Sequence, residues 1–374
     1  MIVGVCKETE ALEKRVALTP EGTEKLSKMG LTIYIESESG LASSYSDQQY
    51  IDSGAEIKKR NQILSETDLL LAVQAPLAED LEKMKKNSAL IAFLWPLQHK
   101  KYVDFLLNAD LTGMAMDTIP RISRAQSMDA LSSMSNIAGY KAALLGANHL
   151  DRYLPMMMTA AGTIPPAKVL VLGAGVAGLQ AIATAKRLGA VVEAFDIRPA
   201  VKEQVESLGA KFVEVPLEEE SETKGGYAKE LSDQNKEKQR EVIHKHVAKS
   251  DIVITTALIP GKPAPQLITR QMVEDMSAGS VIIDIAAEQG GNCEVTEPGK
   301  TIRHNEVIVD GPLNLPSSLA HHASKLYSKN ILSLLDLLIK DGQPNFNFDD
   351  EIIANATVTH NGELISPFVK ENMK

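Results

Sequence analysis

The chain has 374 residues with 39 basic and 49 acidic side chains, and its formal net charge is −10. This length favours two domains, because a single domain commonly holds about 150 residues. The acidic balance argues against a nucleic-acid-binding protein, which needs a basic surface. The cysteines, Cys6 and Cys293, lack the close spacing of zinc or iron–sulfur ligands, so we expect inert thiols, a reducing compartment and no metal site.

No apolar run approaches the roughly 18 residues that a membrane-spanning helix needs. The longest candidates are residues 137–145 and 331–339. The N-terminus leads directly into a predicted strand without the features of a signal peptide, which favours a soluble chain that is not exported. Such a chain can still dock on a membrane protein.

Short apolar runs alternate with helical patterns near the N-terminus, and this βα rhythm predicts a parallel sheet. The strands of this first series are expected at residues 2–5, 32–35, 69–73, 89–93 and 112–115. A helix is expected from about residue 132 to residue 146. A second series follows, with strands expected at residues 168–172, 191–195, 211–213, 252–255, 280–283 and 307–309.

A long amphipathic helix is expected at about residues 318–340, and we expect it to return to the first domain because it comes after the second series. The predicted fold class is α/β, with two Rossmann-like doubly wound parallel sheets and a cleft between the domains. The discontinuous first domain is expected to hold residues 1–131 and 321–374, and the nucleotide-binding domain residues 132–320. Ligands commonly bind between such domains and at the carboxyl ends of strands.

The strongest functional motif is a glycine-rich turn after the first strand of the second series, where residues 169–178 read VLVLGAGVAG. Gly173 permits a tight turn, Gly175 lets the backbone approach a pyrophosphate, and Gly178 allows the next helix to pack closely. This helix, which begins near Val176, presents unpaired N–H groups to the phosphates. The motif therefore predicts a dinucleotide site.

Asp196 ends the next expected strand about 20 residues later, where a carboxylate accepts hydrogen bonds from ribose hydroxyls and repels a 2′-phosphate. This position predicts NAD(H) rather than NADP(H). Arg198 is also compatible with a phosphate contact, but we favour a role in capping the local turn or contacting adenosine. The residues expected to bind the cofactor are Gly173, Gly175, Val176, Ala177, Gly178, Asp196, Ile197, Arg198, Gly226, Tyr227, Ala257 and Leu258.

Two polar segments interrupt the βα rhythm. Residues 216–249 are rich in charge but contain a glycine pair before Tyr227. Composition alone favours a solvated surface insertion, and a mobile flap that closes Tyr227 over a ligand is the alternative. Residues 121–132 (RISRAQSMDALS) place donors, a carboxylate and hydroxyls between the first sheet and a helix. This second pattern fits a ligand site or a helix cap with surface polar residues.

Residues 3–9 (VGVCKET) and 13–20 (EKRVALTP) resemble the start of two related families. These are the alanine dehydrogenases and the NAD(H)-binding component, domain I or α1-type subunit, of proton-translocating NAD(P) transhydrogenase. The resemblance extends over the chain and includes residues 282–286 (IIDIA), 289–291 (QGG) and 314–316 (NLP). These motifs identify the superfamily and leave open the choice between the two families.

Alanine dehydrogenases carry a lysine where Gln74 stands and a histidine in the segment that matches residues 93–96. Oxidation of an amine needs a proton acceptor and a cationic anchor for the substrate carboxylate. Arg15 remains as an anchor, but Gln74 does not titrate and Trp95 does not shuttle protons. A loop shift that brings in His99 keeps a freestanding alanine-type amino-acid dehydrogenase as the alternative function.

Residues 121–132 resemble the transhydrogenase loop that holds the nicotinamide. The resemblance implies that Gln126 and Ser132 orient the nicotinamide carboxamide, and that Arg121 and Asp129 form a charge pair that holds the loop. These four side chains are the expected catalytic residues. The glycine-tyrosine segment likewise resembles the mobile loop that this family folds over its nucleotide.

The resemblance implies an oxidoreductase of the Re/Si-specific transhydrogenase type, which passes hydride from NADH to NADP⁺ on a partner component while a membrane component moves a proton. Hydride then passes between two nicotinamide carbons and needs no acid–base residue, which accounts for Gln74. The chain resembles a separate α1-type subunit or a cloned domain I. We expect a homodimer at the cytoplasmic face of the inner membrane, held there by the NADP(H)-binding and proton-channel components. A nucleotide-sensing module without catalysis is a third possibility.

Three further assignments concern single residues. Asp284 is expected to be a buried carboxylate bonded to loop backbone. His321 and His322 are expected to be surface or capping residues rather than metal ligands. Residues 156–158, all methionine, are expected to serve adaptable packing or to form an apolar patch that faces a partner.

Overall fold

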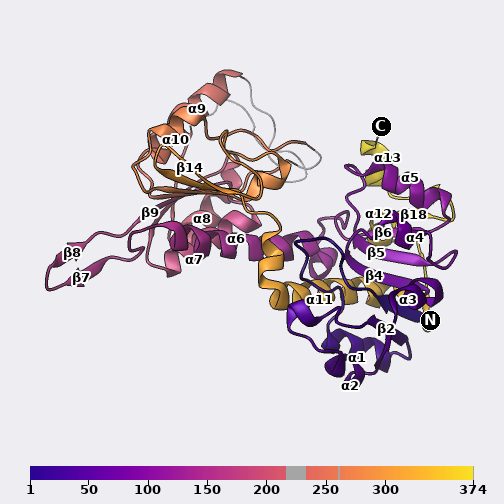
Figure 1. The fold of residues 1–374 in the computed structure, drawn as a ribbon. Coiled ribbons are helices and arrows are strands. Elements are labelled where there is room, and N and C mark those ends of the chain that lie inside the picture. The colour runs from indigo at the N-terminus through magenta and orange to yellow at the C-terminus, as the bar shows by residue number, and fades with distance from the viewer. Residues whose placement is uncertain (216–232, 260–261, 374) are drawn as a thin grey trace. The chain divides into compact units, whose positions relative to one another are not determined.

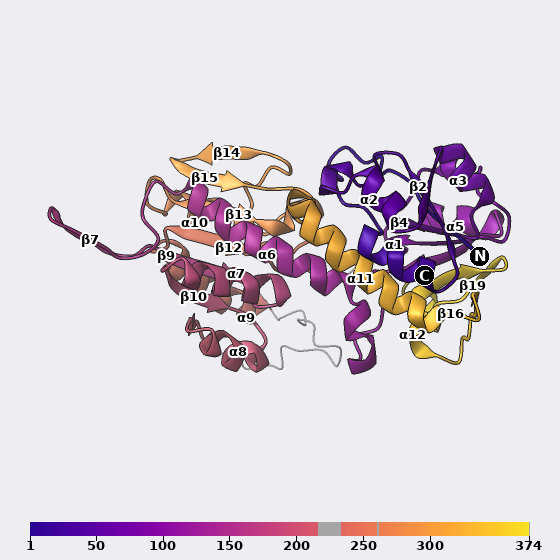
Figure 2. The same cartoon turned by 90° about the horizontal axis from the view of Figure 1, so that it is seen from below.

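The computed structural model describes residues 1–215, 233–259 and 262–373. The chain divides into two compact units, of which the first comprises Met1–Met134 with Pro316–Lys374 and the second Ser135–Leu315. Each unit is built on a sheet of mostly parallel strands with helices packed against it (Figure 1 and Figure 2). The predicted α/β fold class is therefore confirmed.

The strands of the first unit are β1 (Ile2–Val5), β2 (Thr32–Glu36), β3 (Ala55–Lys58), β4 (Leu69–Gln74), β5 (Ala89–Phe93), β6 (Thr112–Ala115), β16 (Ile339–Lys340), β17 (Gln343–Pro344), β18 (Thr357–His360) and β19 (Glu363–Leu364). Its helices are α1 (Pro20–Lys28), η1 (Leu41–Ser43), α2 (Asp47–Asp52), α3 (Arg60–Glu66), α4 (Ala78–Leu81), α5 (Lys100–Asn108), η2 (Ser123–Met128), α11 (Ala320–Leu338), α12 (Glu351–Ala356) and α13 (Pro367–Asn372). Two helices begin at or continue across the boundary between the units, α6 (Ala130–His149) and η5 (Leu315–Leu319).

Eight strands of the described residues form the first sheet, in the order β19-β18-β6-β5-β4-β1-β2-β3. The strands from β1 to β6 are parallel, and β18 joins β6 in the antiparallel sense. Every residue of β5 is buried, and so are the first five of β4. Such continuous apolar runs are expected of central parallel strands that helices cover on both faces.

Helix α11 fixes the N-terminal loop of the first unit. Two of its hydroxyls accept backbone N–H groups of this loop, Ser324 Oγ from Val16 at 2.9 Å and Ser328 Oγ from Thr19 at 3.2 Å. The buried Tyr327 donates its hydroxyl to the carbonyl of Ala72 at 2.9 Å. Residues that lie more than 250 positions apart along the chain therefore hold the loop that carries Arg15.

Two histidines stand at the start of α11. His321 and His322 are both exposed there, which confirms their predicted surface position. The His321 ring stacks on Tyr45 with centroids 4.9 Å apart, and its Nδ1 lies 3.0 Å from the carbonyl oxygen of Ser43. His321 therefore attaches the first turn of α11 to the segment around η1.

The strands of the second unit are β7 (Met157–Thr159), β8 (Gly162–Ile164), β9 (Lys168–Leu172), β10 (Val191–Phe195), β11 (Lys211–Phe212), β12 (Ile252–Thr255), β13 (Val281–Asp284), β14 (Thr301–His304) and β15 (Val307–Asp310). Its helices are α7 (Val176–Arg187), η3 (Pro199–Val201), α8 (Lys202–Ser207), α9 (Asp233–Val247), α10 (Arg270–Glu274) and η4 (Ile285–Gln289). The main sheet has the order β11-β10-β9-β12-β13-β15-β14.

This order is doubly wound, because the chain moves outward from β9 through β10 and β11 and then continues on the other side of β9 with β12. The reversal leaves a crevice at the carboxyl end of β9, which is where nucleotides bind in sheets of this kind. The strands from β9 to β13 and β15 are parallel, and only the edge strand β14 among the described strands of this sheet is antiparallel.

The sequence prediction located the buried strands of both series within one residue or two, and it missed short strands at the edges. Among the missed elements are β3, β14 and the pair β18 and β19. The hairpin β7–β8 was also missed, and both views show it projecting away from the main sheet of its unit (Figure 1 and Figure 2). Within the described residues, no helix has both the length and the apolar character to cross a membrane.

Candidate functional site

The glycine-rich turn links β9 to α7. Gly173 has a φ of +99°, and a Cβ on it would lie 2.6 Å from the Thr256 hydroxyl oxygen. A Cβ on Gly178 would lie only 1.8 Å from the carbonyl oxygen of Gly173. Both positions therefore require glycine for the turn and the helix to pack.

Gly175 stands in a different environment. Its φ is −76° and it lies at the N-cap of α7, a conformation open to any residue. A Cβ placed on it would meet no heavy atom of the described residues within 4 Å. The space in front of the helix N-terminus is therefore open, next to the first N–H groups of α7, at Val176 and Ala177, which have no intrahelical partner.

Asp196 follows β10 directly and is 9% exposed. Its Oδ2 accepts the N–H of Ala174 at 2.8 Å, and its Oδ1 accepts the N–H of Arg198 at 2.9 Å. The Arg198 side chain adds two bonds, Nε to Oδ1 at 2.9 Å and Nη2 to Oδ2 at 2.8 Å. The half-buried Ile197 separates the two residues in the chain. The carboxylate thus joins the glycine-rich turn to the segment after β10.

Ala257 and Leu258 follow β12 at the same carboxyl edge of the sheet. The buried Asn292 accepts the N–H of Ala257 at 3.0 Å and donates Nδ2 to the carbonyl oxygens of Ala257 and Pro265, both at 2.8 Å. Leu258 is 44% exposed. Asn292 therefore shapes the loop that would carry two of the expected cofactor contacts, and sequence reasoning missed it.

Asp284 ends β13 with a completely buried carboxylate. It accepts the N–H groups of Ala286 at 3.1 Å and Cys293 at 3.0 Å, together with the hydroxyls of Thr255 at 2.8 Å and Thr296 at 2.7 Å. The prediction of a buried carboxylate bonded to loop backbone is confirmed. The burial of Cys293 raises the pKa of its thiol to about 11, which fits an inert thiol.

Gly139 of α6 was also missed. A Cβ on it would lie 1.9 Å from the carbonyl oxygen of Ala177, so α6 packs on the first turn of α7 without space for a side chain. The glycine therefore supports the N-terminus of α7 from behind. No local motif marks it, because the contact joins two helices.

The polar segment at residues 121–132 is held in place on both sides. Within η2, Ala125 and Met128 are buried at 1% and 7% exposure. Arg124 binds both oxygens of Asp350, at 2.7 and 3.0 Å, and Asn330 donates Nδ2 to the carbonyl of Ser127 at 2.8 Å. These contacts fix the backbone of the segment.

The side chains expected to act on the nicotinamide extend from this fixed backbone. Asp129 precedes α6 and accepts the N–H of Ser132 at 2.8 Å and the Ser132 hydroxyl at 2.6 Å, so it caps the helix N-terminus. Its charge pair with Arg121 stays a prediction. Arg121 and Gln126 are exposed. Gly226 and Tyr227, the other expected contacts, lie outside the described residues.

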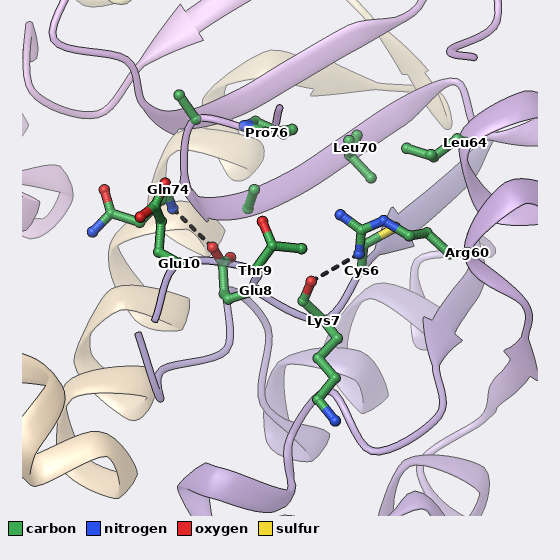
Figure 3. A pocket seen from close by; sticks show the side chains of 12 residues that line it. Cys6, Lys7, Glu8, Thr9, Glu10, Arg60, Leu64, Leu70, Gln74 and Pro76 are labelled. Atoms are coloured by element: carbon green, nitrogen blue, oxygen red, sulfur yellow. Dashed lines mark hydrogen bonds between the residues drawn. The ribbon is translucent and has the colours of Figure 1, made fainter. Parts of the chain in front are cut away.

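A small pocket in the first unit is lined by residues 6–10 and by the end of β4 (Figure 3). At its edge, Glu13 is buried and binds Arg15 through Nε at 2.7 Å and Nη2 at 2.6 Å. Gln74 donates Nε2 to the same carboxylate at 2.9 Å. The Arg15 side chain is 4% exposed, so the cation that sequence reasoning kept as a substrate anchor is paired inside the protein.

Trp95 and His99 lie after β5, in the segment where alanine dehydrogenases carry a histidine. The Trp95 ring has no titratable group to shuttle protons, and it stacks on Phe93 with centroids 5.7 Å apart. The carboxylate of Asp117 accepts the N–H groups of Leu94 at 2.8 Å and of Trp95 at 3.1 Å. His99 is exposed and precedes the first turn of α5.

Two family models match almost the whole chain. The alanine dehydrogenase/PNT N-terminal domain matches residues 4–138, and the alanine dehydrogenase/PNT C-terminal domain matches residues 142–367. The chain belongs to the alanine dehydrogenase/PNT family. The superfamily inferred from the sequence is therefore confirmed.

Relatives from both branches of the alanine dehydrogenase/PNT family align with this member. NAD(P) transhydrogenase subunit alpha of Haemophilus influenzae is 45% identical over 370 residues, which cover 98% of this chain and 72% of the relative. In Rhodospirillum rubrum, the first of the separate chains of NAD(P) transhydrogenase subunit alpha is 46% identical over 377 residues, which cover 98% of both proteins. Alanine dehydrogenase of Mycolicibacterium smegmatis is 30% identical over 382 residues, which cover 100% of this chain and 97% of the relative.

Solved structures of both branches share the fold. The transhydrogenase from Sinorhizobium meliloti superposes with a TM-score of 0.88 at 43% identity, covering 98% of this chain and 100% of that one. An L-alanine dehydrogenase superposes with a TM-score of 0.82 at 26% identity, covering 100% and 99%. Identity thus favours the transhydrogenase branch, and the fold is common to both.

This family member buries three carboxyl groups near the pocket, and their pKa values diverge. Burial raises the pKa of Glu8 to about 7, although its carboxylate accepts the N–H groups of Val73 at 2.6 Å and Gln74 at 3.2 Å. The dashed line in Figure 3 joins Gln74 to Glu8. Burial likewise raises the pKa of Asp117 to about 6. Burial opposes ionisation of Glu13, but the hydrogen bond and charge of Arg15 outweigh it and lower the pKa to about 2.

The raised pKa of Glu8 predicts a pH-dependent stability. Between pH 4.5, its ordinary value, and about pH 7, the folded state keeps a proton that the unfolded state has lost. The free energy of unfolding should therefore fall as the pH rises through this window. In Glu8→Gln this part of the slope should disappear, as measured by urea unfolding from pH 5 to 8. Glu10→Gln, which removes an exposed carboxyl of the same loop, is the control. An unchanged slope in Glu8→Gln would contradict the prediction.

Proposed function

We propose that this chain is the NAD(H)-binding, hydride-donating component of a proton-translocating transhydrogenase, which transfers hydride from NADH to NADP⁺ bound on a partner component. The observation that carries the proposal is the cluster around Glu13. An amino-acid dehydrogenase needs a cation for the substrate carboxylate and a base for the amine. Here Arg15 is bound to Glu13 by two nitrogens, and the uncharged Gln74 donates to the same carboxylate.

The same cluster is compatible with direct hydride transfer. Hydride moves between two nicotinamide carbons, so the protein needs to bind the nucleotide, orient the ring and exclude water. The open helix N-terminus at Gly175 suits a pyrophosphate, because unpaired N–H groups and the helix dipole stabilise negative charge. Asp196 suits the ribose hydroxyls of NAD(H). The greater identity to transhydrogenase subunits, 45–46% against 30%, supports the same choice.

Gln126 and Arg121 are proposed to contact the nicotinamide end of the nucleotide. Their backbone is fixed by the contacts of Arg124 and Ser127, and both side chains are exposed. Arg121→Ala and Gln126→Asn should therefore fold normally and bind NADH, yet lose roughly ten-fold or more of the hydride-transfer rate through misplacement of the ring. Stopped-flow measurement of hydride transfer and calorimetric titration with NADH separate the two effects. Turnover equal to the parent in both variants would refute the assignment.

A mixing experiment tests the proposed function. The purified chain should give no alanine-dependent reduction of NAD⁺. Once the NADP(H)-binding component is added, it should transfer hydride from NADH to an NADP⁺ analogue that absorbs at its own wavelength. Reduction of NAD⁺ by alanine would support the dehydrogenase instead, and NADH binding with neither reaction would support a nucleotide sensor.

We further propose that the chain forms a homodimer and reaches the cytoplasmic face of the inner membrane through its NADP(H)-binding and proton-channel partners. The hairpin β7–β8 supports self-association, because Met156 and Met158 beside it are 58% and 78% exposed and Ile164 is 43% exposed. Exposed apolar side chains gathered on one projecting element are typical of an interface. Sedimentation velocity should give a dimer that Met158→Asp weakens, and a parental monomer at micromolar concentration would contradict the proposal.

A further inference from the structure

The carboxylate of Asp196 is saturated with hydrogen-bond donors. An ionised carboxylate offers about four lone-pair positions. All four are used here, two by the backbone N–H groups of Ala174 and Arg198 and two by the guanidinium of Arg198, at 2.8 to 2.9 Å. The side chains of Arg198 and Asp196 are only 18% and 6% exposed. Asp196 therefore has no acceptor position left for a ribose in this state.

Two of these donors can leave and two cannot. The N–H groups of Ala174 and Arg198 are fixed by the turn after β9 and by the backbone that follows β10. The guanidinium is carried by a flexible side chain and is still partly exposed. A ribose diol that binds Asp196 must therefore replace the guanidinium, and the freed cation would remain at the rim of the ribose site.

A 2′-phosphate meets a different balance. It can bind a guanidinium through charge-assisted hydrogen bonds, and arginine suits phosphate because its nitrogens match the oxygen geometry. To do so here it must take Arg198 from Asp196, which leaves a nearly buried carboxylate without its cation beside a new negative charge. Removing one partner of such a pair is costly.

We propose that Asp196 selects against NADP(H) largely by sequestering Arg198, which is a latent ligand for a 2′-phosphate. The inference rests on the proposed NAD(H)-binding function and adds a residue that sets its specificity. Simple repulsion by the Asp196 carboxylate would act in the same direction, but it would not depend on Arg198. That dependence separates the two explanations.

The test compares Asp196→Asn with Asp196→Asn/Arg198→Gln. Asparagine keeps the size of the side chain and an oxygen for the N–H of Ala174, but it loses the charge that holds the guanidinium. Asp196→Asn should bind NADPH on the order of ten-fold more tightly than the parent does, and the added Arg198→Gln should remove most of that gain. Calorimetric titration with NADPH and NADH measures both affinities.

The matched control is Asp196→Asn/Arg187→Gln, because Arg187 is an exposed cation at the opposite end of α7. It should keep the gain in NADPH affinity. An equal gain with and without Arg198 would overturn the inference and leave repulsion as the cause, and so would the absence of any gain. If Asp196→Asn proves unfolded by circular dichroism, Asp196→Ser serves for the same comparison.

A measurement on the unaltered chain distinguishes failure of this inference from failure of the proposed function. The Nε–H proton resonance of Arg198 should shift when NADH saturates the protein, because the ribose replaces the guanidinium. NADH binding without such a shift would overturn the inference alone. Absence of NADH binding would overturn the proposed function and the inference with it.

Discussion

Replacing Asp284 by alanine is expected to lower the free energy of unfolding of the second unit by about 3–5 kcal/mol. The carboxylate is completely buried and accepts four hydrogen bonds, two from hydroxyls and two from backbone N–H groups. Alanine would leave a cavity lined by four donors without an acceptor. Buried polar groups that lose their partners cost far more than an average hydrogen bond contributes.

Urea unfolding followed by far-UV circular dichroism measures the loss, and hydrogen exchange of the amides of Ala286 and Cys293 locates it. Asp284→Asn should fall between the parent and Asp284→Ala, because one oxygen still accepts while the amide group introduces a competing donor. Glu294→Ala, an exposed position in the same region, is the control for the loss of a carboxylate. Parental stability of Asp284→Ala would show that water or neighbouring groups satisfy the four donors.

The central strands of both sheets were predictable because their burial is recorded in local composition. β5 and β12 are runs of mostly apolar residues buried along their whole length, so hydrophobicity alone marks them. The edge strands carry no such signal. β14 alternates exposed and half-buried residues, and β18 joins the first sheet by pairing with β6, which lies more than 200 residues earlier in the chain.

The candidate site divides in the same way. The glycine-rich turn and Asp196 form a short motif with a mechanical reason at each position, so a sequence pattern suffices. Asn292 and Gly139 act through contacts with residues far away in the chain, and no spacing rule connects them. The partners of Arg15 and Arg198 were equally hidden, because each cation is neutralised two residues away by a carboxylate whose orientation only the fold determines.

The same distinction between fold and ligand leads to the second large effect, at the glycines of the turn. Gly175→Ala is expected to raise the dissociation constant for NADH by roughly 10- to 100-fold while leaving the protein at least as stable as the parent. Its backbone conformation is ordinary and its added methyl would meet no described atom, so the folded state has no cause for strain. The unfolded chain would even lose entropy, which can add up to about 1 kcal/mol of stability.

The cost would appear only with the ligand, because the methyl would occupy the space through which a pyrophosphate approaches the N-terminus of α7. Gly178→Ala should behave in the opposite order. Its methyl would lie 1.8 Å from the carbonyl oxygen of Gly173, so the turn or the helix must move, at a cost of about 1–3 kcal/mol or more.

Thermal unfolding and calorimetric titration with NADH, performed on both variants, separate the two glycines. A stable Gly175→Ala protein with parental affinity would place the pyrophosphate elsewhere and remove the main structural support for the nucleotide site. A stable protein with weakened binding would mean that the bound nucleotide, and none of the described residues, requires glycine at position 175.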